Sequence, residues 1–151
     1  MVTGQEGGCR CGKIRFRINA EPFVTAVCHC RGCQKMTASA FSTTLTLPAD
    51  ALEIIEGEPE LGGLHGEEAR HHHCGWCKSW LFTRLPPEYG AVNVRATMLD
   101  DAGGFVPFME TYTSERLPWA QTGAAHSFDK FPEPSDYPRL MQEYAESHAS
   151  S

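Results

Sequence analysis

Seven cysteines in three tight groups constrain the fold of this chain more than any other feature of its sequence. Seven is an odd number, so a framework made only of disulfides would leave one thiol unpaired. Chance rarely brings CxC, CxCxxC and CxxC spacings together in one chain, so metal binding explains them better than free buried thiols do. The groups are GGCRCG with Cys9 and Cys11, CHCRGC with Cys28, Cys30 and Cys33, and HCGWC with Cys74 and Cys77.

Two of the groups supply the right number of ligands for one closed zinc site. Structural zinc is held tetrahedrally by four thiolate or imidazole ligands, and the CxC and CxxC pairs together offer four. Gly7, Gly8 and Gly12 beside the first pair are expected to allow the tight turn that aims two close thiols at one ion. The pairs lie far apart in the sequence. The metal would therefore join the first strand to a later hairpin, and its removal is expected to unfold the domain.

The group CHCRGC keeps three thiols and has no fourth cysteine. Three protein ligands and one exchangeable position are the pattern of a catalytic zinc. One alternative is that His29, or one of His71, His72 and His73, completes the coordination and closes the site. Another is a redox function for CGWC, although thioredoxin-type motifs begin a helix and this stretch leads into a strand-like segment. The sequence alone leaves these alternatives open.

The charge pattern bears on the partners of the protein. The 151-residue chain is long enough for one domain with its own core and carries a formal net charge of −6. Its basic residues are scattered, so no basic stripe for nucleic acid or an anionic membrane is present. The start shows no signal peptide, and the apolar stretches are too short to cross a bilayer. We therefore predict a cytoplasmic protein with reduced thiols, and neither nucleic acid nor a membrane as partner.

Alternating apolar residues predict a mainly β protein. In residues 13–20, Phe16 and Ile18 alternate with basic residues, which is the pattern of a half-buried strand. The 14 glycines and 10 prolines also favour short elements joined by turns. Pro107 indicates that a strand over residues 105–113 is irregular or lies at an edge. Further strands are predicted at 23–27, 40–47, 52–57, 78–85 and 92–96, and in the segment before Cys74.

The pattern predicts one long helix at the end of the chain. Ser135 can cap it, and Leu140 and Tyr144 follow at helical spacing. Pro138 is compatible with this helix because it falls in the first turn. The remaining expectations are a short helical turn at 31–39, a surface hairpin at 57–68, a domain over residues 1–131 and a C-terminal helical tail over 132–151.

Four stretches, taken in order, resemble one known family. They are GGCRCGKIRF, CHCRGCQKMTASAF, HCGWCKSWLF and ERLPW, and together they extend over roughly residues 4 to 119. They are similar to the glutathione-dependent formaldehyde-activating enzyme family, also described as the GFA or centromere-protein-V domain. The cysteine spacings are highly specific in this order, and ERLPW adds weaker support.

The resemblance implies a fold, two zinc sites and a reaction. The fold is a β-tent of small, mostly antiparallel sheets held together by zinc. The reaction is the condensation of glutathione with formaldehyde to S-hydroxymethylglutathione, a carbon–sulfur lyase-type activity in which we expect the substrate thiol at the open position of the second zinc. The implied ligands are Cys9, Cys11, Cys74 and Cys77 for a structural zinc and Cys28, Cys30 and Cys33 for a catalytic zinc.

Two local features of the sequence bear on the substrate. Glutathione is anionic, so Arg31 and Lys35 are the candidate contacts, with two merely solvated side chains as the alternative. The chain also departs from the family pattern, with TAS at 37–39 where a glycine is frequent and CKS at 77–79 where Cys-Gly-Ser is usual. The alternative to an enzyme is a noncatalytic, zinc-stabilised module that binds a protein partner. The sequence does not indicate the oligomeric state.

Overall fold

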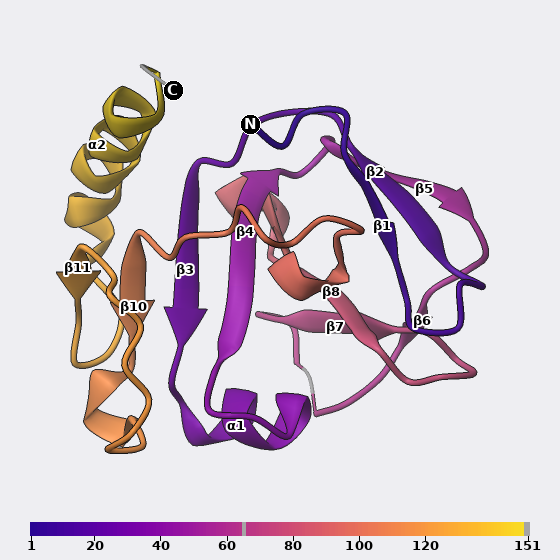
Figure 1. Cartoon of the computed structure of the whole chain (residues 1–151), viewed down its shortest axis with the longest axis horizontal. Helices are drawn as coiled ribbons and strands as arrows, with labels where there is room; N and C mark the ends of the chain where they lie inside the picture. Colours follow the sequence, from indigo (N-terminus) through magenta and orange to yellow (C-terminus); the bar gives the residue numbers. More distant parts are fainter. Residues whose placement is uncertain (65, 150–151) are drawn as a thin grey trace. The chain divides into compact units, whose positions relative to one another are not determined.

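The computed structural model describes residues 1–64 and 66–149 and divides into two compact units (Figure 1). The first unit contains the CxC and CxxC pairs, and the second contains CHCRGC. Each unit has its own cluster of buried apolar side chains. The first unit comprises Met1–Pro22 and Leu45–Phe105, and the second comprises Phe23–Thr44 and Val106–Ser151.

A three-stranded antiparallel sheet begins the first unit. Its strands are β1 (Glu6–Gly8), β2 (Arg15–Ile18) and β5 (Leu52–Glu56). β2 lies between the other two strands. Phe16 and Ile18 are fully buried, whereas Arg17 between them forms an ion pair with Glu6, with Nη2 2.6 Å from Oε1. The alternation that predicted this strand is therefore confirmed.

A longer antiparallel arrangement carries most of the core of the first unit. Its strands are β4 (Ser42–Pro48), β6 (Glu60–Leu61), β7 (Arg70–His73), β8 (Trp80–Arg84) and β9 (Ala91–Val94). From Leu45 onward β4 pairs with β9, and the order continues through β8 and β7 to β6. Leu47, Leu81 and Val92 are fully buried in one cluster. The turn between β7 and β8 is thereby anchored on a well-packed sheet.

Parallel pairing distinguishes the second unit. Its elements are β3 (Val24–Cys28), α1 (Arg31–Thr37), β10 (Met109–Thr111), β11 (His126–Ser127) and α2 (Tyr137–His148). β10 lies between β3 and β11 and runs parallel to both, which the long connections between these strands allow. Leu140 and Tyr144 of α2 are buried in one cluster with Val24, Ala26 and Met109 of the strands. This cluster supports the strand that leads into CHCRGC.

The strand predicted over 105–113 differs most from the observed element. Only Met109–Thr111 forms a strand and residues 105–108 do not, so the irregular alternative is confirmed. The strand has a partner on each side, so the edge alternative is wrong. Pro107 falls before the strand begins, where its missing N–H costs no ladder hydrogen bond. A proline close to a strand therefore did not mark an edge in this case.

The C-terminal helix is confirmed, but Ser135 does not cap it. The residues Pro134–Asp136 form a 3-10 turn, and the N-cap of α2 is Asp136. The predicted hairpin at 57–68 is confirmed in part: β6 lies within this range, but its partner β7 begins only at Arg70. Residue 65 lies outside the described residues. β1 and β11 were not predicted, because glycine-rich and very short strands carry little sequence signal. The predicted boundary after residue 131 stays a prediction.

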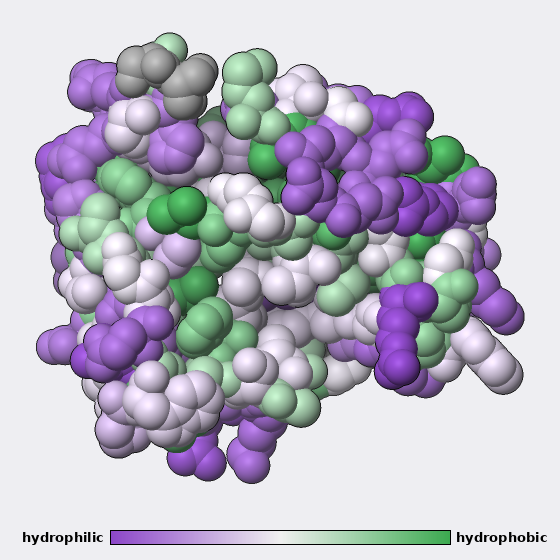
Figure 2. Space-filling model, in the orientation of Figure 1, coloured by the Kyte–Doolittle hydropathy of each residue, from purple (hydrophilic) through white to green (hydrophobic). Residues whose placement is uncertain are grey.

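Hydrophilic and hydrophobic residues share the surface, as Figure 2 shows for one face of the molecule. Two of the three tryptophans are largely exposed, Trp76 at 72% and Trp119 at 71%. Within residues 1–64 and 66–149, no helix has the length and apolar character needed to cross a membrane.

Candidate metal centres

Four cysteine sulfurs meet in the first unit. Cys9 and Cys11 come from the turn between β1 and β2, and Cys74 and Cys77 come from the turn between β7 and β8. The four sulfurs lie within 4.8 Å of one another, and Cys11 Sγ is 3.5 Å from Cys9 Sγ and 3.7 Å from Cys74 Sγ. Four sulfurs bound at about 2.3 Å to a tetrahedral zinc lie about 3.8 Å apart. This four-cysteine group therefore fits a zinc ion.

Hydrogen-bond donors surround the sulfurs of the four-cysteine group. The Ile14 N–H donates to Cys9 Sγ at 3.3 Å, and the Cys77 N–H donates to Cys74 Sγ at 3.5 Å. The Ser79 hydroxyl lies 3.3 Å from Cys77 Sγ. Burial raises the pKa of the Cys77 thiol, but hydrogen bonds from Ser79 and nearby groups outweigh burial and lower this pKa to about 5. Cys77 therefore favours the thiolate form that a metal requires.

The glycines beside the four-cysteine group have two different roles. Gly12 has a φ of 81°, the left-handed conformation that the predicted tight turn requires. Gly7 and Gly8, predicted to serve the same turn, lie in β1 instead, so that part of the prediction is wrong. Gly7 is needed for close packing, because a Cβ atom there would lie 2.3 Å from the carbonyl oxygen of Met98.

Three cysteine sulfurs meet in the second unit. Cys28 ends β3, Cys30 is the N-cap of α1 and Cys33 lies in the first turn of that helix. Their sulfurs all lie within 4.8 Å of one another. The Cys33 N–H donates to Cys30 Sγ at 3.3 Å, so a sulfur takes the place that a serine or threonine oxygen has at many helix starts. The end of a strand and the start of a helix thus bring the three-cysteine group together.

The three thiols differ in acidity. The Cys33 thiol donates a hydrogen bond that lowers the pKa of Cys28 to about 5, although burial opposes this shift. The same hydrogen bond and burial raise the pKa of Cys33, and burial raises the pKa of Cys30. The group thus forms one thiolate readily and resists three, because adjacent negative charges repel each other. A bound cation removes that repulsion, so the donor set fits zinc.

The histidines that were alternative ligands contact other groups. His29 Nε2 lies 3.6 Å from Glu110 Oε2, and within the described residues neither cysteine group includes a histidine. The HHH segment lies in a strand, as predicted, and its three histidines are half-buried. Burial lowers the pKa of His72 to about 4. The three rings contact side chains of β8: His71 Nδ1 lies 2.8 Å from Thr83 Oγ1, the His72 ring stacks 4.7 Å from Phe82, and the His73 ring stacks 6.4 Å from Trp80.

Sequence reasoning missed the polar residues that hold the CHCRGC loop. Gln34 Nε2 donates to the carbonyl oxygens of His29 at 2.7 Å and of Glu115 at 3.0 Å. Glu115 Oε1 accepts a hydrogen bond of 2.9 Å from the Arg31 N–H at the start of α1. The only sequence signal was that Glu115 begins the stretch ERLPW, which supported the family resemblance without a role of its own.

The two predicted substrate contacts lie on α1 beside the three-cysteine group. Arg31 begins the helix, Lys35 follows four residues later, and both side chains are exposed. Residues at this spacing share one helix face. The two cations are therefore accessible to an anionic ligand on that face, and their contact with a substrate stays a prediction.

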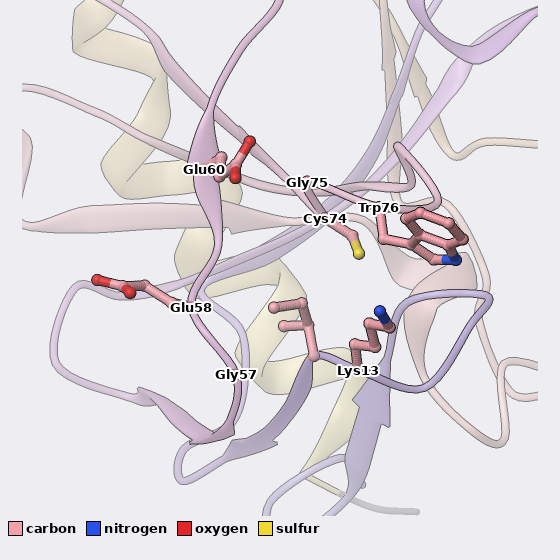
Figure 3. Close-up of a pocket in the computed structure, with 8 residues that line it drawn as sticks. Lys13, Gly57, Glu58, Glu60, Cys74, Gly75 and Trp76 are labelled. Atoms are coloured by element: carbon pink, nitrogen blue, oxygen red, sulfur yellow. The ribbon is translucent and has the colours of Figure 1, made fainter.

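A pocket of about 350 Å³ lies beside the four-cysteine group (Figure 3). The Lys13 amine lies 4.6 Å from the centre of the Trp76 ring at one end of the pocket, and Glu58 and Glu60 lie toward the other. Cys74 is the only cysteine in the lining. The pocket therefore belongs to the first unit and contains none of the three-cysteine group.

Each departure from the family pattern, TAS at 37–39 and CKS at 77–79, includes one residue with its backbone in the left-handed region. Ala38 ends α1 with a φ of 51°, and Lys78 follows the last cysteine with a φ of 64°. Glycine adopts this conformation without steric cost, whereas other residues pay about 1–2 kcal/mol. The glycines usual in the family suit these two turns better than the residues present. Each departure therefore places a residue with a Cβ atom in a conformation that favours glycine, which the sequence pattern alone did not reveal.

Comparison with known proteins agrees with the sequence resemblance. A Halomonas elongata protein whose name places it among the glutathione-dependent formaldehyde-activating enzymes is 32% identical over 93 residues. The match covers 55% of this chain and 59% of that protein. The chain thus spans less than two thirds of that relative.

The chain is also similar to the crystal structure of a Rhodobacter sphaeroides protein, with a TM-score of 0.56 and 19% sequence identity. The match covers 70% of this chain and 99% of that one, and it shows a shared fold alone. The family model for the glutathione-dependent formaldehyde-activating enzymes matches residues 4–115, which is most of the chain. The chain therefore belongs to the glutathione-dependent formaldehyde-activating enzyme family.

Proposed function

We propose that the protein is a zinc-dependent carbon–sulfur lyase-type enzyme that acts on glutathione or on a glutathione adduct, as S-hydroxymethylglutathione synthase does. The observation that carries the proposal is the three-cysteine group, which gathers three sulfurs and, within the described residues, no fourth ligand. A metal held by three protein ligands keeps one position for a substrate. Membership of the family supports glutathione and formaldehyde as the reactants.

The protein's own groups would prepare the reactants. Cys28, Cys30 and Cys33 would hold the zinc, which when bound supplies deprotonation of a thiol and polarisation of a carbonyl. Arg31 and Lys35 would bind the carboxylates of glutathione and orient its sulfur. In the overall reaction a sulfur–carbon bond forms, the carbonyl π bond of formaldehyde breaks, and the thiol proton ends on the carbonyl oxygen.

The compartment belongs to the proposal as well. All seven cysteines are free thiols, which fits a reducing environment such as the cytoplasm. Glutathione is held in its reduced form in the same environment, so enzyme ligands and substrate would share one redox requirement.

The test is a calorimetric titration of the zinc-loaded protein with reduced glutathione, together with the rate of S-hydroxymethylglutathione formation above the uncatalysed background. We expect saturable binding that is lost in Cys30→Ser, along with turnover. Serine is a good N-cap, so this variant keeps α1 capped and leaves the four-cysteine group untouched.

The matched control ligand is S-methylglutathione, which keeps both carboxylates but has no free thiol. We expect it to bind much more weakly than glutathione. Equal binding of the two ligands, or full binding by Cys30→Ser, would contradict a substrate thiol at the three-cysteine group. No binding of either ligand would favour the noncatalytic, protein-binding alternative.

A further inference from the structure

His29 occupies an unusual place between two of the three cysteines. Its side chain is fully buried, and its ring packs edge-on against the Phe41 ring with the two ring centres 5.5 Å apart. Its Nε2 atom lies 3.6 Å from Glu110 Oε2, and neither ring nitrogen makes a direct hydrogen bond. A buried imidazole usually pairs with a polar group. The carboxylate of Glu110 is the polar group that faces this ring.

Glu110 is itself fixed from several directions. Its side chain is 4% exposed, and Arg116 Nη1 donates to Oε1 at 3.1 Å. Ser127 Oγ donates to the same oxygen at 3.2 Å, and the Thr122 hydroxyl donates to Oε2. A buried carboxylate with this many donors stays ionised and keeps one orientation. It can therefore act as a rigid partner for the imidazole.

The backbone around His29 is tied to the same part of the chain. The His29 N–H donates to the Thr111 carbonyl oxygen at 3.0 Å, next to Glu110 on β10. Gln34 joins the His29 carbonyl oxygen to that of Glu115, and the Glu115 carboxylate accepts from the first N–H of α1. Residues 110–116 thus contact the CHCRGC loop through both its backbone and its one imidazole.

We infer that His29 and Glu110 act as a positioning pair that holds Cys28 and Cys30 in the arrangement the metal needs. This inference rests on the proposed function in one respect, because it takes the three cysteines as metal ligands. His29 lies directly between the two cysteines, so displacement of its ring moves both sulfurs. The pair also gives the ERLPW stretch a role, because Arg116 orients Glu110 and Glu115 supports the start of α1.

The pair acts beside the hydrogen bonds that Gln34, Glu115 and Thr111 make with this loop. The three ligands lie within six consecutive residues, so the metal itself fixes no distant part of the chain. Three thiolates also repel each other, and a loop free to move would separate them. Groups that orient metal ligands typically contribute about 10–100-fold to metal affinity.

The experiment measures zinc affinity at both cysteine groups by competition with a chromophoric chelator, and it uses no glutathione. In Glu110→Gln we expect zinc affinity at the three-cysteine group to fall about 10–100-fold, while affinity at the four-cysteine group stays unchanged. Glu143→Gln is the matched control. It removes another carboxylate that faces a histidine in the same unit, with His126 Nε2 2.8 Å from Glu143 Oε2. We expect the control to leave both affinities unchanged.

A cycle with His29→Phe tests the pair itself. Phenylalanine keeps an aromatic ring beside Phe41 but loses the contact with Glu110. We expect the double variant His29→Phe/Glu110→Gln to lose no more zinc affinity than the single variant that has the larger loss. Both substitutions break the same interaction, so their effects should not add. Additive losses, or wild-type affinity in Glu110→Gln, would overturn the inference. If the buried substitutions prevent folding, Arg116→Gln replaces them, because Arg116 is partly exposed and donates to Glu110 Oε1. Unchanged affinity at the three-cysteine group in that variant would overturn the inference equally.

The spectrum of cobalt at the same group separates positioning from general stability. We expect the cobalt d–d bands of Glu110→Gln to shift relative to those of the wild type, because the sulfur positions change. Identical spectra with a lower melting temperature would assign the pair to core stability and overturn the inference. A wild-type protein that binds only one zinc ion would instead refute the proposed function.

Discussion

The two cysteine groups bring sulfurs together in opposite ways. In the first unit the ligands come from two turns, and Cys11 and Cys74, whose sulfurs lie 3.7 Å apart, are separated by 63 positions in the sequence. In the second unit all three ligands lie between Cys28 and Cys33, on one strand end and one helix start. The first group joins distant parts of the chain, and the second is a single local loop.

This difference predicts two different roles for a bound metal. A link between distant positions removes many conformations of the unfolded chain, so its binding energy becomes folding energy. A link within six residues removes few, so a metal there depends on a loop that the rest of the protein has already shaped. The protein supplies this shape through residues such as Glu110 and Gln34. A metal that joins distant segments therefore suits a structural role, and a metal held by one local loop suits the exchange of a ligand.

The largest expected effect comes from the four-cysteine group. We expect Cys11→Ser to lower the free energy of unfolding by at least about 5 kcal/mol, which is enough to unfold a typical domain. Cys11 is exposed, so the substitution removes a ligand without opening a cavity in the core. Thermal denaturation of the zinc-loaded variant and wild type measures the change.

Cys30→Ser is the matched comparison in the other unit. It also removes one sulfur ligand, and we expect its melting temperature to stay close to that of the wild type while turnover is lost. Equal destabilisation by the two substitutions would remove the distinction between an architectural and an exchangeable metal. A melting curve of the wild type that does not change after complete zinc removal would contradict the architectural role.

The grouping of the cysteines was predictable from sequence because ligand counting is local and discrete. Counting ligands predicted one group of four and one of three, with a histidine ligand as an open alternative, and the structure brings together these two cysteine groups. Alternation predicted β2 for a similar reason, because Phe16 and Ile18 report burial two residues apart. The identity of the metal stays a prediction.

The support of the three-cysteine group could not be predicted in this way. Glu110 lies 81 positions after His29, and nothing in FVPFMETYT distinguishes its carboxylate from an exposed one. The parallel pairing of β10 with β3 and β11 also depends on long-range packing rather than on a local pattern. The sequence motif therefore revealed the ligands, and only the fold revealed what holds them.

The next prediction concerns the close packing of β1, which leads into the turn with Cys9 and Cys11. We expect Gly7→Ala to lower the free energy of unfolding by about 2–3 kcal/mol, because the added methyl group would lie 2.3 Å from the Met98 carbonyl oxygen and 2.7 Å from the Phe16 ring. We also expect weaker zinc binding at the four-cysteine group alone. Urea denaturation and chelator competition measure the two effects.

Gly12→Ala is the contrasting change in the same region. Beyond its two chain neighbours, no atom of the described residues lies within 4 Å of the position of its Cβ, so the left-handed backbone is what opposes the substitution. We expect a loss of about 1–2 kcal/mol, smaller than that of Gly7→Ala. A larger loss of unfolding free energy in Gly12→Ala than in Gly7→Ala would show that close packing of β1 is not the main constraint here. A change in zinc affinity at the three-cysteine group in Gly7→Ala would show that β1 does not serve the four-cysteine group specifically.

The smallest expected effects are gains, one beside each cysteine group. Lys78 and Ala38 both have positive φ angles, so replacement by glycine relieves about 1–2 kcal/mol of backbone strain. Glycine also adds about 0.4–1 kcal/mol of entropy to the unfolded chain, so we expect Lys78→Gly and Ala38→Gly each to gain about 0.5–1 kcal/mol. Ser39→Gly is the control, because Ser39 has no positive φ and should only lose stability. If Ser39→Gly gained as much as Ala38→Gly, relief of strain would not be the cause.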